Sequence, residues 1–396
     1  MPQTSLPKSS FVLFLILGSI GLLTPFAIDM YLPAMPTIAN DFMVNHGLVQ
    51  ATLTAYTAGF ALGQLLHGPL ADSYGRRPIL MGGIVFFAIA SIICATTTSI
   101  EALLYTRFAQ GFAGAAAAVI VQAIVRDMFD KEEFARAMSF ITLVITISPL
   151  LAPMIGGHLA VWFGWRSIFT VLAAVSFFVL LAVLFNIPET LAPENKQTLR
   201  FKITMRNYFK LITNPVVFGL IFCGAFSFAG MFAFITAGSF VYIDIYGVQP
   251  EYFGYLFALN VVGMVAMTSF NGRAVRKMGS HWMLRFGLWC QTFAGVALLA
   301  SWLLGLGLWA IVPCVILFVG TISIIGSNSM GLLLSSYPQM AGTASSLAGT
   351  LRFGVGAAIS ALIAFLPSGY VWPMVIAMFL CAVLSASCYW LLSRNA

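Results

Sequence analysis

The chain has 396 residues, of which 60% are apolar and 8% are charged. Soluble proteins keep about a quarter of their residues charged, so this composition excludes a water-soluble protein and indicates one that lies in lipid. The net charge of +7 does not indicate nucleic-acid binding, because the basic residues lie in short segments between apolar stretches and not on one solvated face.

Apolar stretches long enough to cross a bilayer as helices, which takes roughly 20 residues each, follow one another along the whole chain. We count twelve: residues 11–35, 47–69, 79–97, 101–125, 137–161, 165–187, 215–236, 253–272, 282–304, 307–330, 342–366 and 370–392. We predict an all-α integral membrane protein whose twelve transmembrane helices form two pseudo-symmetric six-helix bundles. The first stretch lacks a small-residue cleavage site, so we expect a retained helix and not a signal peptide.

The first stretch carries a carboxylate, Asp29, about six residues before the predicted outer end of its helix, or roughly 9 Å deep. An ionised group inside a membrane is costly, so such residues usually face a cavity or a partner and mark a transport path. We predict that Asp29 binds and releases a coupling proton. The alternative is that its side chain reaches outer water beside Pro33.

A polar turn separates the second stretch from the third: Gly68-Pro69-Leu70-Ala71-Asp72-Ser73-Tyr74-Gly75-Arg76-Arg77-Pro78. Gly75 would allow a tight turn between the two helices. We expect Asp72 to accept a hydrogen bond at the amino end of the eleventh helix, where the helix dipole is positive. We expect Arg76 to pair with Asp127 at the end of the fourth helix. The alternative is a plain cluster of cytoplasmic basic residues, which requires only Arg76 and Arg77.

The fourth stretch places Arg107 and Gln110 on one face, together with several small residues that favour close helix packing. Arg107 would lie roughly 9 Å below the outer start of its helix, at the depth of Asp29. We predict that the two form the proton-coupling pair. The alternative is that Arg107 only ties the helices together.

The fifth stretch contains Pro149, Pro153, Gly156 and Gly157, which would bend the helix and thin its surface. The alternative is the ordinary tolerance of membrane helices for proline and glycine.

The longest polar segment, 188–215, divides the stretches six and six. We predict one lobe over residues 1–190 and another over 215–396, joined by a cytoplasmic linker, 191–214, with an amphipathic helix near 200–210. The connection 271–279 repeats the glycine and paired basic residues of 68–78, as a duplicated six-helix unit requires. Lys and Arg gather in the connections on one side, which predicts that both termini are cytoplasmic.

Arg352 lies about eleven residues into the eleventh stretch, roughly 16 Å deep, with no acidic residue in its own helix. We predict that it meets Asp29 across the lobes or attracts an anionic part of a substrate; the alternative is a structural arginine bonded to carbonyl groups. A substrate cavity should be largely apolar with a few polar groups. The other predicted lining residues are Tyr31, Tyr56, Gln64, Gln110, Phe228, Phe232, Asn260 and Asn328.

The sequence offers no catalytic or metal-binding pattern. The six cysteines lie scattered within predicted helices and the four histidines are widely dispersed. The motifs G-x-x-x-x-G-K-[ST], H-E-x-x-H and G-x-S-x-G are absent. We therefore expect neither an enzyme nor an ATP-driven pump, with no metal and no cofactor.

Several of these segments resemble motifs of the major facilitator superfamily. Residues 68–78 are similar to its G-x-L-a-D-r-x-G-r-k motif and residues 107–111 to its R-x-x-Q-G motif. Residues 152–157 resemble the G-P-x-x-G-G motif of its antiporters, with Ala152 in place of the first glycine. Together with residues 28–36, they make the chain resemble the twelve-span drug:proton antiporters, most closely the bicyclomycin-resistance branch.

This resemblance implies a monomeric exporter of the bacterial inner membrane that exchanges protons for small, mostly apolar compounds such as bicyclomycin or sulfonamides. The two lobes would rock about a central site by alternating access. It also implies that one group of residues forms a conformational gate: Gly68, Asp72, Gly75, Arg76, Arg77 and Asp127.

Two alternatives stay open. The same fold would serve a proton-coupled importer or exporter of a nutrient such as an amino acid or dipeptide, and the sign of the uptake phenotype would distinguish them. A channel or membrane enzyme belongs to another class. A channel would pass current without a proton gradient, and an enzyme would need catalytic groups that the sequence lacks.

Overall fold

The structure is a computed structural model that describes residues 10–129, 131–192, 194, 201–336, 341–367 and 369–394. Over these ranges the chain is helical and contains no β-strand, which confirms the predicted all-α class. Eleven helical segments of the described chain are long and apolar enough to cross a membrane. The protein is therefore a multi-pass membrane protein. Part of the predicted linker, residues 193 and 195–200, lies outside the described residues.

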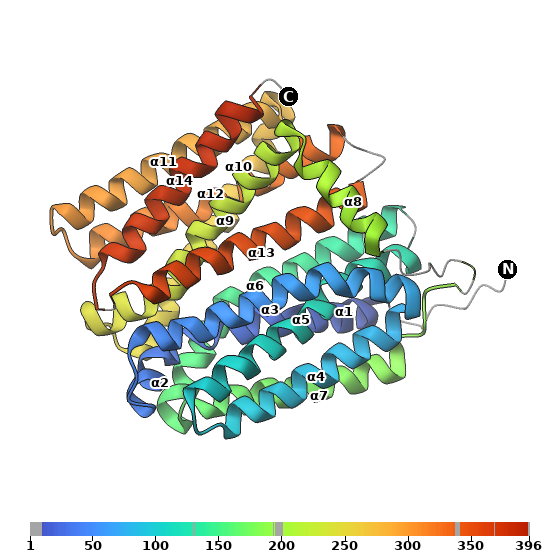
Figure 1. Cartoon of the computed structure of the whole chain (residues 1–396), viewed down its shortest axis with the longest axis horizontal. Coiled ribbons are helices and arrows are strands. Elements are labelled where there is room, and N and C mark those ends of the chain that lie inside the picture. The colour runs from blue at the N-terminus through green and yellow to red at the C-terminus, as the bar shows by residue number, and fades with distance from the viewer. Residues whose placement is uncertain are drawn as a thin grey trace.

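The helices of the first half, blue to green in Figure 1, lie beside one another. Their bounds are α1 (Ser10–Asp29), the 3₁₀ turn η1 (Leu32–Ala34), α2 (Met35–Asp41), α3 (His46–Tyr74), α4 (Arg76–Thr96), α5 (Ile100–Met128), α6 (Lys131–Phe163) and α7 (Arg166–Asn186). Asn45 and Ser99 begin α3 and α5, since their side-chain oxygens accept hydrogen bonds from backbone N–H groups of the first turn.

The linker contains α8 (Phe201–Ile212), whose bounds are close to those predicted for an amphipathic helix near 200–210. The second half, yellow-green to red in Figure 1, follows it. Its elements are α9 (Pro215–Ser239), the π-helical turn η3 (Phe240–Ile245), α10 (Pro250–Met278), α11 (Ser280–Leu303), α12 (Leu308–Ser336), α13 (Ala341–Phe365) and α14 (Trp372–Leu392). Proline stands in the first turn of α9, α10 and α14, where its missing N–H costs no intrahelical bond.

The first span differs from the predicted single helix over 11–35. Helix α1 ends at Asp29, a turn at Met30 and Tyr31 follows, and η1 and α2 carry the chain on to Asp41. Pro33 and Pro36 supply no backbone N–H, so they interrupt the hydrogen-bond ladder and allow the helix to restart. Asp29 consequently lies at a helical break, not in an unbroken helix.

Helix α3 is 29 residues long, but it is not among the eleven apolar segments. It contains polar side chains such as Gln50, Gln64 and His67, which lower its hydropathy. It packs closely on α5 and, across the two halves of the chain, on α13. Glycine permits the first of these contacts: a Cβ at Gly111 of α5 would lie 2.0 Å from the Tyr56 carbonyl oxygen of α3.

Most of the packing between helices lies within each half of the chain. In the first half α4 packs on α5 and α7, and α1 on α6; in the second, α9 packs on α14, and α11 on α12. The halves meet mainly where α3 packs on α13 and where α6 packs on α10. Any movement of one half against the other would act at these two contacts.

The two halves share a backbone feature at the repeated connection. Gly75, at φ 112°, ends α3 and precedes α4, and Gly279, at φ 81°, ends α10 and precedes α11. Both values lie in the region that favours glycine. The structure thus places an equivalent tight turn at each of the two segments whose sequences resemble each other.

Candidate functional site

The turn between α3 and α4 holds a cluster of charged side chains that we call the gate cluster: Asp72, Arg76, Asp127 and Glu189. The Arg76 side chain, only 5% exposed, donates from Nη1 to Asp72, one helical turn earlier. Its Nε lies 3.2 Å from Oδ2 of Asp127 on α5, which confirms the predicted Arg76–Asp127 pair. Arg76 therefore ties α3, α4 and α5 together at this end of the bundle.

Glu189 is a member of this cluster that the sequence analysis missed. Its carboxylate accepts hydrogen bonds from the backbone N–H groups of Arg76, at 2.9 Å, and Arg77, at 3.2 Å, and so caps α4. Gly75 leaves room for it, because a Cβ there would lie 2.4 Å from Glu189 Oε2. Arg77 adds a hydrogen bond from Nη2 to the Leu184 carbonyl oxygen of α7, at 2.7 Å. An acidic residue directly after the sixth span was the available signal.

Asp72 does not have its expected partner in this conformation. Its carboxylate pairs with Arg76 of the neighbouring turn, and no described contact joins it to the amino end of α13. A pair at this i,i+4 spacing satisfies the carboxylate locally. Gly68, the first residue of the predicted gate, lies one turn before Asp72, and a Cβ there would lie 3.7 Å from Val119 of α5, an ordinary contact distance.

Asp29 is 5% exposed and is the last residue of α1. Within the described part of the chain it forms no salt bridge and no hydrogen bond through its side chain. Burying an ionised carboxylate without a partner is strongly unfavourable. A carboxyl group in this position is a functional candidate, because structural stability gives no reason to place it there.

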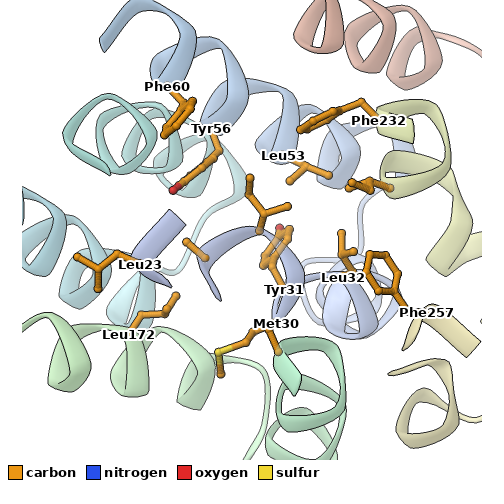
Figure 2. Close-up of a cluster of buried hydrophobic side chains, with 14 of the residues drawn as sticks. Leu23, Met30, Tyr31, Leu32, Leu53, Tyr56, Phe60, Leu172, Phe232 and Phe257 are labelled. Atoms are coloured by element: carbon orange, nitrogen blue, oxygen red, sulfur yellow. The ribbon is translucent and has the colours of Figure 1, made fainter. Parts of the chain in front are cut away.

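Arg107 is fully buried in a set of side chains that we call the arginine cage: Tyr31, Tyr56, Gln110 and Ser91. Its guanidinium carbon lies 4.7 Å from the ring centre of Tyr31 and 4.4 Å from that of Tyr56. Arg107 Nη1 donates to Gln110 Oε1 at 2.6 Å, and Gln110 Nε2 donates to Ser91 Oγ at 2.8 Å. Figure 2 shows both tyrosines in the buried cluster. The cage stabilises the cation with ring faces and an amide, without a carboxylate.

Asp29 and Arg107 lie in the same region but do not form a salt bridge in this conformation. Tyr56 is within electrostatic range of both groups. Tyr31, which contacts the Arg107 guanidinium, follows Asp29 by two residues in the turn after α1. Two guanidinium nitrogens of Arg107, Nε and Nη2, are buried without hydrogen-bond partners. The structure thus brings the two predicted residues near a common tyrosine and leaves both with unused hydrogen-bonding capacity.

Helix α6 touches the helical break after Asp29 through its glycines. A Cβ at Gly156 would lie 2.1 Å from the Met30 carbonyl oxygen, and a Cβ at Gly157 would lie 2.8 Å from that of Pro250, the first residue of α10. The helix continues through both of its prolines, Pro149 and Pro153. These adjacent glycines therefore place α6 against the Asp29 turn on one side and against the second half of the chain on the other.

The predicted substrate-lining residues make their contacts in two separate groups. Tyr31, Tyr56 and Gln110 belong to the arginine cage, whereas Phe228 and Phe232 lie in an aromatic cluster of α9 and α13. Figure 2 shows Phe232 entering the same buried core as Tyr31 from the second half of the chain.

The polar members of that list differ in how well they are satisfied. Asn328 donates to Asn271 Oδ1 at 2.8 Å and so joins α12 to α10. Gln64 Oε1 and Asn260 Oδ1 are buried without hydrogen-bond partners. Gln64 faces the position of Gly349 on α13, across the contact between the halves. Unsatisfied polar atoms in a membrane interior are candidates for ligand contact, whereas the Asn328 amide already has partners.

Arg352 lies near the middle of α13 and stacks on an aromatic ring. Its guanidinium carbon is 4.2 Å from the ring centre of Phe228. The described residues provide it with no salt bridge and no hydrogen bond, and its Nε is buried without a partner. The structure therefore contradicts the alternative of an arginine satisfied by carbonyl groups.

These features define a class of protein: a multi-pass, all-helical membrane transporter with charged and polar groups buried between its helices. Among the described residues, no group of three or more His, Cys, Asp or Glu side chains could hold a metal ion. The sequence profile of the Major Facilitator Superfamily matches residues 17–361. The chain belongs to this superfamily, whose members are membrane transporters and not enzymes.

Relatives and solved structures agree with this placement. The chain is 43% identical to a bicyclomycin resistance protein homolog of Haemophilus influenzae, over 98% of each protein. It is 27% identical to multidrug resistance protein D of Escherichia coli, over 84% of each. The fold matches a D-xylose-proton symporter with a TM-score of 0.74 at 16% identity, covering 95% of this chain and 97% of that one. It also matches a peptide transporter in complex with sulfate, with a TM-score of 0.75 at 15% identity, over 98% and 96%. At such low identity the two structures show the fold alone.

Proposed function

We propose that this transporter is a proton-coupled antiporter that exports small, drug-like compounds across the bacterial inner membrane by alternating access. The names of its relatives support drug efflux and make bicyclomycin the first candidate substrate. Sulfonamides are a second candidate, which the resemblance of the motifs implies. The observation that carries the proton coupling is Asp29, a buried carboxylate without a partner at a helical break.

In this proposal α3 also crosses the membrane and brings the eleven apolar spans to twelve. Two six-helix lobes, residues 1–190 and 215–396, then move against each other. The close packing of α3 on α5 and α13 supports a membrane position for α3. The basic residues gathered on one side of the membrane support cytoplasmic termini. The transporter would act as a monomer.

Protonation of Asp29 would change the contacts between the lobes through the turn at Met30 and Tyr31. When Asp29 is ionised, it requires a positive partner, and Arg107 has two nitrogens free to provide one. Reaching Arg107 would disturb the ring of Tyr31, which now covers the guanidinium. Because the Met30 carbonyl oxygen rests on Gly156, the turn can push α6, and Gly157 passes that displacement to α10.

The gate cluster would stabilise one access state of the transport cycle. Arg76, the first residue of α4, pairs with both Asp72 and Asp127 only while α3, α4 and α5 keep their present spacing. A change in the α3–α13 contact would separate Asp72 from Arg76 and free it for the amino end of α13. The gate would thus exist in two charge arrangements, one for each access state.

The test is drug movement in proteoliposomes under an imposed pH gradient. We expect Asp29→Asn to reduce gradient-driven transport at least tenfold, because an amide cannot exchange a proton at this site. Glu101→Gln is the matched control, since Glu101 is an exposed acidic residue in the first turn of α5. Native rates in Asp29→Asn would contradict the proposal. Transport with the proton flow, and not against it, would favour the nutrient importer instead.

A further inference from the structure

We infer that the cavity beside Arg352, between α9, α12 and α13, is a binding subsite for the carboxylate of a transported molecule, with the apolar side chains of the cavity wall beside the molecule's apolar part. The inference deepens the proposed function by naming a substrate class. It rests on that function only in assuming that the bound molecule is transported. All residues that line the site lie in the second half of the chain, so the site is separate from Asp29 and the arginine cage.

The first argument is the absence of a resident anion. Helices α9, α12 and α13 contain no Asp or Glu, and α3, which packs on α13, has its single acidic residue, Asp72, near its far end. Arg352 has no salt bridge and no hydrogen bond to any described residue. A partly buried guanidinium whose Nε is buried without a partner is unfavourable in the absence of an anion. An anion supplied by a ligand would compensate the charge and satisfy the free N–H groups.

The second argument is the space beside the guanidinium. Arg352 lines a small cavity of about 30 Å³, which is room for a small group such as a carboxylate. Small residues form part of the wall: Gly224 of α9 and Gly326 of α12 line the cavity, with Ser329 one turn after Gly326. A Cβ at Gly326 would lie 3.1 Å from Arg352 Nη2, so glycine keeps the guanidinium accessible.

The third argument is the apolar surface around the charge. The guanidinium lies over the ring of Phe228, which packs edge-to-face against Phe353 and so holds the arginine in place. The wall of the cavity itself is apolar, with side chains such as Leu220 and Leu333. A cation in an apolar wall fits an apolar molecule that carries one anionic group.

The position of Arg352 distinguishes a solute from a lipid. It is near the middle of the 25-residue helix α13, so each end of the helix is roughly 18 Å away. A phosphate of a lipid headgroup lies at the membrane surface and would not reach this depth. The ligand is therefore a molecule that enters the interior of the protein.

The experiment compares naphthoate with naphthamide, which differ in a carboxylate and share the same rings. Dissociation constants are measured by calorimetry on the purified full chain in detergent, in buffer without chloride. We expect native protein to bind naphthoate at least tenfold more tightly, since a hydrogen bond to a charged group is worth about that factor. Equal dissociation constants, or no binding of naphthoate at millimolar concentration, would overturn the inference.

Three variants assign the preference to this cavity. Arg352→Gln should abolish the tenfold preference and leave naphthamide binding within about twofold of native. Gly326→Ala, which keeps the charge but crowds Nη2, should weaken naphthoate alone by several-fold. Arg285→Gln is the matched control, because Arg285 lies on α11 against Tyr389 and Trp390, and it should change neither value. A preference that survives in Arg352→Gln places the anion site elsewhere.

The outcome is independent of proton coupling. Binding in detergent needs no gradient, so a preference for naphthoate would stand even if Asp29→Asn transported at the native rate. Conversely, loss of transport in Asp29→Asn with equal affinity for the two probes would support antiport and overturn the carboxylate subsite. If Arg352→Gln fails to fold, the native comparison and Gly326→Ala still decide the matter.

Discussion

Arg107 and Arg352 both lie in long apolar helices, but Arg107 is fully buried and Arg352 only partly, and their surroundings differ. Arg107 on α5 is enclosed by two tyrosine rings and an amide oxygen. Arg352 on α13 has one ring beneath it and a cavity beside it. The first environment stabilises the charge within the protein, and the second leaves part of the stabilisation to a ligand. A buried charge thus has different consequences depending on how many of its N–H groups the protein itself satisfies.

The largest expected effect is on thermal stability. Arg107→Ala should lower the free energy of unfolding by about 3 kcal/mol, because it leaves a void between two rings and removes the partner of Gln110. Arg352→Met should cost less than about 1 kcal/mol or stabilise the protein, since it replaces an uncompensated charge with an apolar group of similar length. Melting temperatures of the two variants in one detergent give the comparison. An equal or larger loss for Arg352→Met would mean that Arg352 is also structurally satisfied.

The sequence analysis predicted those features of the two arginines that depend on a single helix. Apolar composition located eleven helices long and apolar enough to cross a membrane, and position along the helix predicted that Arg107 and Arg352 lie well inside theirs. The spacing of three residues between Arg107 and Gln110 correctly placed them on one face, and they are hydrogen-bonded. Such contacts follow from the geometry of one helix, which the sequence contains directly.

The features that the sequence analysis did not predict depend on segments that are far apart in the chain. Glu189 caps α4 from 113 residues away, and nothing local to Arg76 indicates this partner. The tyrosine pair around Arg107 comes from α3 and from the turn after α1, so it appears only when three segments are packed. The break at Asp29 had a local signal in Pro33 and Pro36, but proline is common in membrane helices and so does not determine where a helix is interrupted.

A smaller effect would test whether the arginine cage behaves as a unit. Ser91→Ala removes the acceptor of Gln110 Nε2 and should cost about 1–2 kcal/mol in unfolding free energy, because a buried amide is left unsatisfied. In a background of Arg107→Ala the same change should cost clearly less, since Gln110 is then free to turn away. Thermal unfolding of the single and double variants measures this. Strict additivity would show that Ser91 supports Gln110 without reference to the arginine.

The smallest effect concerns the ring beneath Arg352. Phe228→Leu should cost about 1 kcal/mol in unfolding free energy through the lost cation–π contact, and nearly nothing through volume. The matched control is Phe222→Leu on the same helix, whose ring packs on Phe218 and Phe226 and has no arginine beside it among the cation–π contacts of the described residues. In an Arg352→Gln background the cost of Phe228→Leu should fall to that of the control, which a double-mutant cycle of melting temperatures detects. If the cost is unchanged without the arginine, the ring acts only through packing. Arg352 would then lack the one stabilising contact that its surroundings provide, and its need for an external anion would be greater still.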